Sequence, residues 1–178
     1  MKKVRLHDKV FRESIPYTVI GENIVSMARR INEDFAGRDT PVFICILNGS
    51  FMFAAELLKC IRFNCEVSFV KLASYSGISS GESVSELVGL AGSLKGRHVI
   101  VLEDIVETGA TVKAVDDIVA RHNPASVSYA TLFFKPESYR EDIRIDYYAM
   151  ELPNDFIVGF GLDYSQLGRN LKDIYTLE

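Results

Sequence analysis

Two apolar runs of strand length, each followed by a glycine-containing turn and a helical pattern, constrain the fold most. Residues 42–47 (VFICIL) lead through a turn at residues 48–50 into a helical pattern over 51–61, and residues 99–102 (VIVL) lead through a second turn into a helix over 112–120. Such strands need cover on both faces of a sheet. The repeated strand–turn–helix order therefore predicts an α/β protein with a central, mostly parallel sheet flanked by helices.

The rest of the chain extends this pattern. Residues 20–35 space their apolar side chains as a helix does, and Gly37 follows as a stop. Further strands are expected over residues 66–73, 125–134, 146–150 and 156–159. With 178 residues, 48% of them hydrophobic, the chain suits one domain, residues 1–178, and shows no internal repeat or linker.

Charge and cysteine usage exclude several classes of function. The net charge of −4 argues against a nucleic-acid partner, which calls for a basic face. The uncharged stretch over residues 41–55 is too short to span a bilayer, so no membrane partner is expected. No signal peptide is recognised, and an odd number of cysteines without a C-x-x-C pair indicates reduced thiols, so we expect a cytoplasmic protein. The three cysteines are Cys45, Cys60 and Cys65.

The composition shifts over residues 74–83 (SYSGISSGES). Such a polar, glycine-rich run does not pack easily in a core and predicts a long loop. An idle excursion is one interpretation. A flexible lid over a binding site is favoured, because long loops in compact domains usually carry function.

The turn after the second apolar strand carries the chemistry. Glu103 and Asp104 end the strand, and residues 107–111 (ETGAT) open the helix. A helix N-terminus offers free N–H groups and partial positive charge to a phosphate, whereas neighbouring carboxylates suit the hydroxyls of a ribose or a metal ion. Together these features describe a site for ribose 5-phosphate. An ordinary turn with solvated carboxylates remains the alternative, and neither a P-loop nor a dinucleotide fingerprint is present.

Residues 99–111 (VIVLEDIVETGAT) resemble the phosphoribosyl-pyrophosphate signature of the type I phosphoribosyltransferases. Residues 47–50 resemble the pyrophosphate-binding loop of that family, and Ser74-Tyr75 resembles the start of its closing loop. The late residues follow the hypoxanthine-guanine branch: Lys135, residues 156–159, residues 162–164 and Arg169. The resemblance implies the type I phosphoribosyltransferase fold, with a small hood from the N-terminal and C-terminal segments and a flexible lid loop over about residues 74–92.

The resemblance also implies roles for single residues. Carboxylates would hold the ribose hydroxyls and meet Mg²⁺, backbone groups at the turn would bind the 5′-phosphate, and a lysine and an aromatic ring would read a 6-oxopurine. The implied residues are Glu107 as catalytic acid/base; Glu103, Asp104, Thr108, Gly109, Ala110 and Thr111 for ribose phosphate; Asn48, Gly49 and Arg169 for pyrophosphate; Ser74 and Tyr75 in the lid; Lys135, Phe156 and Ile157 for the purine; and Asp163, Glu103 and Asp104 for Mg²⁺.

Two positions depart from the family pattern. Glu107 stands where the family normally has aspartate, which keeps the carboxylate but moves it by one methylene. Asn48 stands where lysine or arginine is usual, which suggests that the backbone of this loop binds pyrophosphate. In this family the peptide joining Leu47 and Asn48 is often cis.

The resemblance implies a pentosyltransferase of purine salvage. It would transfer 5-phosphoribosyl from phosphoribosyl pyrophosphate to N9 of hypoxanthine or guanine, giving IMP or GMP and pyrophosphate, with Mg²⁺ as cofactor. The family forms dimers and tetramers, so a homodimer or homotetramer is expected. Two alternatives stay open: a type I transferase for xanthine or another base, and a non-catalytic nucleotide-binding regulator on the same fold.

Overall fold

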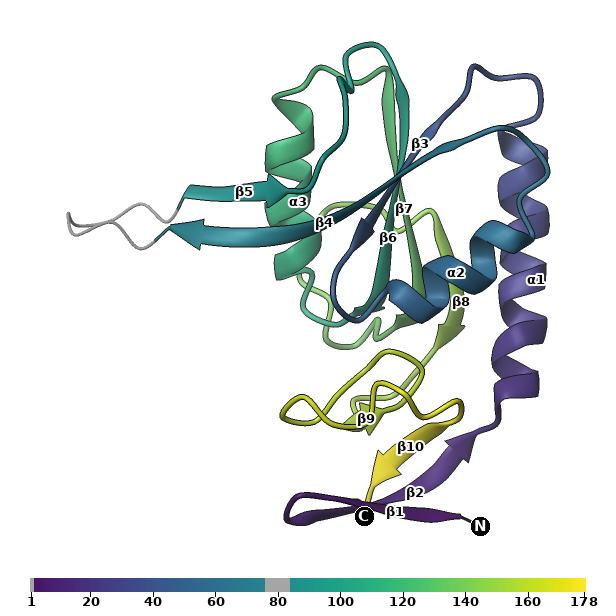
Figure 1. Ribbon diagram of the computed structural model, residues 1–178, viewed down its shortest axis with the longest axis vertical. Coiled ribbons are helices and arrows are strands. Elements are labelled where there is room, and N and C mark those ends of the chain that lie inside the picture. The colour runs from purple at the N-terminus through teal and green to yellow at the C-terminus, as the bar shows by residue number, and fades with distance from the viewer. Residues whose placement is uncertain (1, 76–83) are drawn as a thin grey trace.

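The computed structural model describes residues 2–75 and 84–178 (Figure 1). A larger sheet with its helices forms one part, and a smaller sheet lies at one end of it. In chain order the elements are β1 (Lys3–Leu6), β2 (Lys9–Ile15), α1 (Tyr17–Asp34), β3 (Val42–Ile46), α2 (Phe51–Lys59), β4 (Glu66–Tyr75), β5 (Val84–Val88), β6 (His98–Val106), α3 (Ala110–Ala120), β7 (Ser126–Phe134), β8 (Tyr147–Glu151), β9 (Ile157–Val158) and β10 (Ile174–Leu177).

The larger sheet has the strand order β5-β4-β3-β6-β7-β8. Strands β4, β3, β6, β7 and β8 pair in parallel, and β5 pairs antiparallel with β4. The predicted parallel sheet is thus confirmed. The chain leaves β3 toward one edge and β6 toward the other. The crevice where the strand order diverges is where such sheets bind ligands, beyond the carboxyl ends of the strands.

Alternate residues of the central strands enter two hydrophobic cores on opposite faces of the sheet. Phe43 and Cys45 of β3 pack on the face that α1 and α2 cover, whereas Val42 and Ile44 pack on the face that α3 covers. All four side chains are buried. The uninterrupted apolar pattern of this strand follows from cover on both faces.

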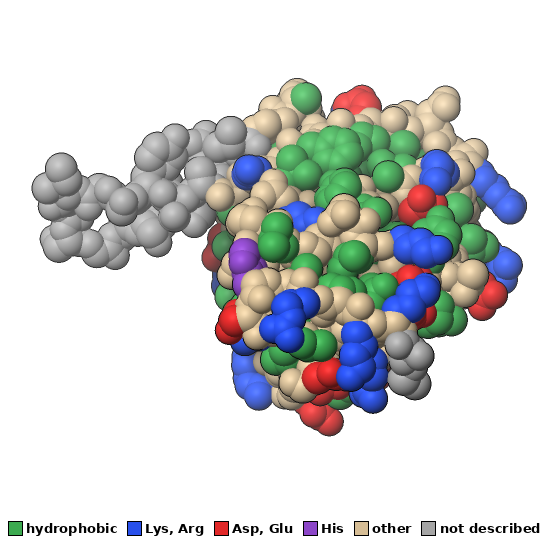
Figure 2. All heavy atoms as spheres, turned by 60° about the horizontal axis from the view of Figure 1, so that its bottom comes forward, with side chains coloured by type: hydrophobic (Ala, Val, Ile, Leu, Met, Phe, Trp, Pro, Cys, Tyr) green, Lys and Arg blue, Asp and Glu red, His purple; other side chains and the backbone are tan. Residues whose placement is uncertain are grey.

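The smaller sheet joins the two ends of the chain. Its order is β1-β2-β10-β9, and all its pairings are antiparallel. A third core, formed by Leu6, Phe11, Val158 and Tyr175, packs within it. Figure 2, with this end turned forward, shows Lys and Arg side chains, interspersed with Asp and Glu, around hydrophobic ones on this face.

Element boundaries differ from the sequence prediction in informative places. Helix α3 begins at Ala110, two residues before the predicted start, and β6 runs on to Val106, so both elements reach into the turn. Of the predicted lid loop over residues 74–92, residues 74–75 end β4 and residues 84–88 form β5. Those flanks are therefore paired strands rather than irregular loop. Residues 76–83 lie outside the described residues.

Among the described helices, none combines the length and apolar character that crossing a membrane requires.

Candidate active site

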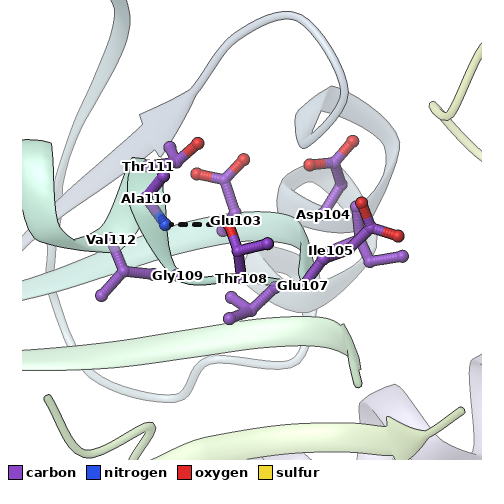
Figure 3. A pocket seen from close by; sticks show the side chains of 10 residues that line it. Glu103, Asp104, Ile105, Glu107, Thr108, Gly109, Ala110, Thr111 and Val112 are labelled. Carbon is purple, nitrogen blue, oxygen red and sulfur yellow. Dashed lines mark hydrogen bonds between the residues drawn. The ribbon is translucent and has the colours of Figure 1, made fainter. Parts of the chain in front are cut away.

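A pocket opens where β6 passes into α3, and residues 103–112 line it (Figure 3). The turn after β3, residues 47–50, lies beside it, because β3 and β6 are neighbours in the sheet. The structure therefore brings together the acidic pair, the glycine turn and the predicted pyrophosphate loop. It does so at the crevice that the topology favours.

The turn before α3 exposes the first N–H groups of that helix. Gly109 has a φ of +92° and precedes the helix, so no side chain at this position can cap it. The N–H of Ala110 donates to Oγ1 of Thr108 at 3.4 Å. A Cβ on Gly109 would come within 2.7 Å of the side chains of Tyr139 and Glu141. The left-handed backbone and these neighbours thus favour glycine at position 109.

The two carboxylates at the end of β6 are partly or fully buried. Asp104 is buried, Glu103 is half-buried, and both carboxylates point the same way in Figure 3. Burial raises the pKa of Glu103 well above its ordinary value, and the neighbouring charge of Asp104 adds to this effect. Burial also raises the pKa of Asp104, while hydrogen bonds with Glu103 and with backbone groups, and the charge of Arg169, act in the opposite direction. Groups that donate hydrogen bonds or positive charge here would relieve this cost.

Lys135 follows β7 and is buried, yet its ammonium group has two partners. It donates to the carboxylate of Glu107 and, at 2.8 Å, to the carbonyl oxygen of Asp155. An ammonium group has three N–H donors, so the contacts made by the described residues leave one donor for a ligand. Sequence reasoning named Lys135 and Glu107 separately, and the structure joins them in one ion pair.

Asp163 and Arg169 face each other across a tight turn. Arg169 Nη2 lies 2.5 Å from Oδ1 of Asp163, and the N–H of Gln166 donates to Oδ2 at 2.7 Å. The guanidinium also donates to the carbonyl oxygen of Gly161 at 2.7 Å. Both side chains are about one quarter exposed.

Phe156 and Ile157 lie at the edge of the smaller sheet. Phe156 is 46% exposed, whereas Ile157 is buried in β9. Tyr164 lies 5.9 Å from the Phe156 ring, edge to face, and the ammonium group of Lys9 lies over both rings. Because the Phe156 ring is exposed, it lies outside the core and offers a flat surface to a ligand.

The turn after β3 contains the Leu47–Asn48 peptide in the cis form, as the resemblance implied. Asn48 is exposed and Gly49 is buried. Ser50 is fully buried and donates through Oγ to the carbonyl oxygen of Ile46 at 2.6 Å. Ser74 and Tyr75 are described only as backbone at the end of β4.

Within the described residues, no three His, Cys, Asp or Glu side chains gather closely enough to hold a metal ion together. The predicted metal residues, Asp163, Glu103 and Asp104, therefore form no all-protein cage. Their carboxylate oxygens are the ligand type that Mg²⁺ prefers, and Mg²⁺ commonly takes only one or two of them beside water and phosphate oxygens. The donor set thus fits this ion.

Two residues that sequence reasoning did not single out contact the site. The carbonyl oxygen of Asp155 accepts from Lys135, and the backbone of Gly161 meets both Arg169 and Gly49. Asp155 and Gly161 make these contacts through backbone atoms, which side-chain chemistry in the sequence does not reveal. The closely spaced Gly159 and Gly161 were the only signal available.

Comparison with known proteins places this chain in a family. The phosphoribosyl transferase domain family matches residues 17–165. The chain is 41% identical over 154 residues to the hypoxanthine-guanine phosphoribosyltransferase of Streptococcus thermophilus, covering 85% of this chain and 84% of the relative. It is 36% identical over 174 residues to the enzyme of the same name from Streptococcus pneumoniae, covering 97% and 96%.

Solved structures agree with these relatives. A hypoxanthine-guanine phosphoribosyltransferase from Bacillus anthracis superposes with a TM-score of 0.84 at 30% identity, covering 96% of this chain and 98% of that one. The hypoxanthine phosphoribosyl transferase of Trypanosoma cruzi gives 0.84 at 31% identity, covering 98% and 95%. The fold is thus that of a phosphoribosyltransferase. The chain belongs to the phosphoribosyltransferase family and, within it, to the branch of the hypoxanthine-guanine phosphoribosyltransferases.

Proposed function

We propose that this protein joins a 6-oxopurine to ribose 5-phosphate in purine salvage. Phosphoribosyl pyrophosphate would supply the sugar, N9 of hypoxanthine or guanine would bond to C1 of the ribose, and pyrophosphate would leave with IMP or GMP as product. The observation that carries the proposal is the acidic pair of Glu103 and Asp104 immediately before a glycine turn at a helix N-terminus. Family membership supports the reaction class.

The sugar phosphate would bind across this turn. The N–H groups of residues 107–111 would donate to the 5′-phosphate, which the partial positive charge of the α3 N-terminus also stabilises. Glu103 and Asp104 would accept hydrogen bonds from the 2′- and 3′-hydroxyls. The same carboxylates would stabilise positive charge that develops on the ribose ring as the bond to pyrophosphate breaks.

The base would lie between Lys135 and Phe156. The free N–H of Lys135 would donate to the 6-oxo group, which adenine lacks. Phe156 would stack on the purine, and backbone groups of Ile157 would meet its edge. The carboxylate of Glu107 would accept the proton that the purine loses as N9 bonds to C1.

Pyrophosphate would be held by the backbone of Asn48 and Gly49 and by the guanidinium of Arg169. Mg²⁺, when bound, neutralises the charge that collects on pyrophosphate as it leaves. Asp163, Glu103 and Asp104 would hold it together with water and substrate oxygens. A lid that includes Ser74 and Tyr75 would exclude water, which otherwise competes with the purine.

We further propose a cytoplasmic location and a homodimeric or homotetrameric state, with small-molecule substrates and neither nucleic acid nor membrane as partner. The location is proposed from the cysteine usage, the absence of a nucleic-acid partner from the net charge of −4, and the oligomeric state from the dimers and tetramers that the family forms.

The proposal is tested by supplying phosphoribosyl pyrophosphate, Mg²⁺ and one base at a time, and measuring nucleotide and pyrophosphate. Hypoxanthine or guanine should yield IMP or GMP with one pyrophosphate each, and chelation of the metal should stop the reaction until Mg²⁺ is restored. No turnover of either base would defeat the assignment. Turnover of xanthine or adenine alone would identify a different transferase, and salt-dependent RNA binding without turnover would identify a regulator.

A further inference from the structure

Two buried glycines touch where the C-terminal segment meets the turn after β3. A Cβ on Gly161 would lie 2.0 Å from the carbonyl oxygen of Gly49. A Cβ on Gly49 would in turn lie 1.5 Å from Oδ2 of Asp104. The backbone of Gly49 therefore fills the space between Gly161 and the acidic pair, with no room for a methyl group on either side.

Arg169 holds Gly161 in place through two hydrogen bonds. The N–H of Gly161 donates to the carbonyl oxygen of Arg169 at 3.0 Å, and its own carbonyl oxygen accepts from the Arg169 guanidinium at 2.7 Å. Gly161 also has a φ of +101°, which residues with a Cβ rarely adopt. Its place is thus set by the C-terminal segment, and it does not follow the turn that it touches.

The turn around Gly49 is anchored to the elements on either side of it, β3 and α2. Ser50 is fully buried and bonded to Ile46 of β3, and α2 begins at Phe51. An added group at position 161 would meet the carbonyl oxygen of Gly49, and because Gly49 lies against Asp104 on its other side, a shift of this peptide would change its position relative to Asp104.

We propose that Gly161 is a positioning residue for the pyrophosphate loop. It acts through Gly49. Because Gly161 has no side chain, the carbonyl group of Gly49 can pack directly against it, and this contact sets the position of the Asn48–Gly49 backbone relative to Asp104. This proposal rests on the function proposed above, because it assumes that this backbone receives the pyrophosphate. It makes the fit of pyrophosphate depend on a residue that would touch no substrate itself.

The test is Gly161→Ala, with two ligands that differ in the relevant group. Phosphoribosyl pyrophosphate carries pyrophosphate, whereas IMP has the ribose 5-phosphate and a base but no pyrophosphate. A displaced loop should raise the Kd for phosphoribosyl pyrophosphate with Mg²⁺ by at least about tenfold, because small misplacements of binding groups cost this much or more. The Kd for IMP, which carries no pyrophosphate, should stay within about threefold of wild type, well under the tenfold that about 1.4 kcal/mol of binding free energy represents.

Gly159→Ala is a matched control. Gly159 has a φ of +106°, and a Cβ there would lie 2.1 Å from the carbonyl oxygen of Asp173, so the backbone strain and the clash are alike. That clash involves Asp173, which directly precedes β10, and does not involve Gly49. We expect Gly159→Ala to lose a comparable amount of thermal stability but not to lose affinity selectively for phosphoribosyl pyrophosphate.

Four results would overturn the proposal: unchanged binding in Gly161→Ala, equal weakening of both ligands, the same selective loss in Gly159→Ala, or a Gly161→Ala chain that does not fold while Gly159→Ala does. The last would make the contact a requirement of folding. The function is judged on a different sample, since a wild-type chain that makes no nucleotide from either 6-oxopurine defeats the proposed function whatever the variants do.

Discussion

The buried ammonium group of Lys135 donates to the carboxylate of Glu107 at the mouth of the pocket. The lysine side chain is 4% exposed and the glutamate side chain 52% exposed. Glu107 thus supplies the negative charge that a cation in this position requires, and Lys135 fixes where that carboxylate stands. One pair links the residue proposed to accept the purine proton with the residue proposed to read the purine oxygen.

Glu107→Gln tests the acid/base role. The amide keeps the size of the side chain but cannot take a proton at neutral pH, so kcat should fall by about a hundredfold or more. Glu107→Asp restores the usual residue of the family and should keep kcat within about tenfold of wild type, since the carboxylate remains. The measurement is the steady-state rate with saturating substrates. A Glu107→Gln variant as fast as wild type would contradict the acid/base role of Glu107.

Lys135→Met tests recognition of the 6-oxo group. Loss of a charged hydrogen bond of about 1.5–3 kcal/mol should raise the KM for hypoxanthine at least about tenfold. The KM for phosphoribosyl pyrophosphate should change little, since Lys135 lies on the base side of the site. Lys59→Met is the control: this lysine of α2 is 65% exposed and pairs with Glu56, away from the pocket. Equal changes in both KM values would contradict a role in reading the base.

Combining Glu107→Gln with Lys135→Met measures how strongly the two side chains depend on each other. Unfolding by urea should show that the double variant loses less stability than the sum of the single variants, because each single change leaves the other group without its partner. Strictly additive losses would mean that the ion pair contributes nothing to the folded state.

The raised pKa of Glu103 gives a pH dependence with a defined sign. The folded state keeps this carboxyl protonated above its ordinary pKa of about 4.5, so it binds more protons than the unfolded state in that range. The free energy of unfolding therefore falls as pH rises from about 4.5 through the folded-state pKa. Glu103→Gln removes this loss.

Urea unfolding at several pH values checks this expectation. The Gln variant should match wild type near pH 4 and be more stable at pH 8, while losing affinity for the ribose. A stability difference that stays constant with pH, or that favours wild type at high pH, would contradict the burial argument. A stabilising change that harms function is what a site residue predicts.

The central sheet could be predicted from the sequence because its signals are local. Residues 42–46 and 99–102 are apolar on both faces, and the turns after them contain glycine. The smaller sheet was not predicted strand by strand. Strand β2 pairs with β10 at the other end of the chain, and β1 and β10 are only four residues long. Short strands that depend on distant partners leave little periodicity to read.

The candidate site shows the same division. The acidic pair and the glycine turn are contiguous in sequence, and the structure brings them together in one pocket. The ion pair between Glu107 and Lys135 and the contact between Gly49 and Gly161 join positions far apart in the chain. Only the parallel pairing of β6 with β7, and the return of the C-terminal segment, place these groups together.

Asp163→Asn tests the proposed metal role. The substitution removes one charge from a pair with Arg169 whose side chains are only about one quarter exposed, so the loss of stability should lie between the roughly 1 kcal/mol of an exposed pair and the roughly 3–5 kcal/mol of a fully buried one. The rate of turnover should fall by far more than this loss of stability explains. The Mg²⁺ concentration for half-maximal rate should rise. A rate and a Mg²⁺ dependence equal to those of wild type would refute the role.

A crystal structure of this protein with bound IMP tests the account most directly. The 5′-phosphate should accept hydrogen bonds from backbone N–H groups of residues 107–111, and the ribose hydroxyls should lie within hydrogen-bond distance of Glu103 and Asp104. A phosphate bound elsewhere, with this turn unoccupied and both carboxylates remote from the ribose, would contradict the account.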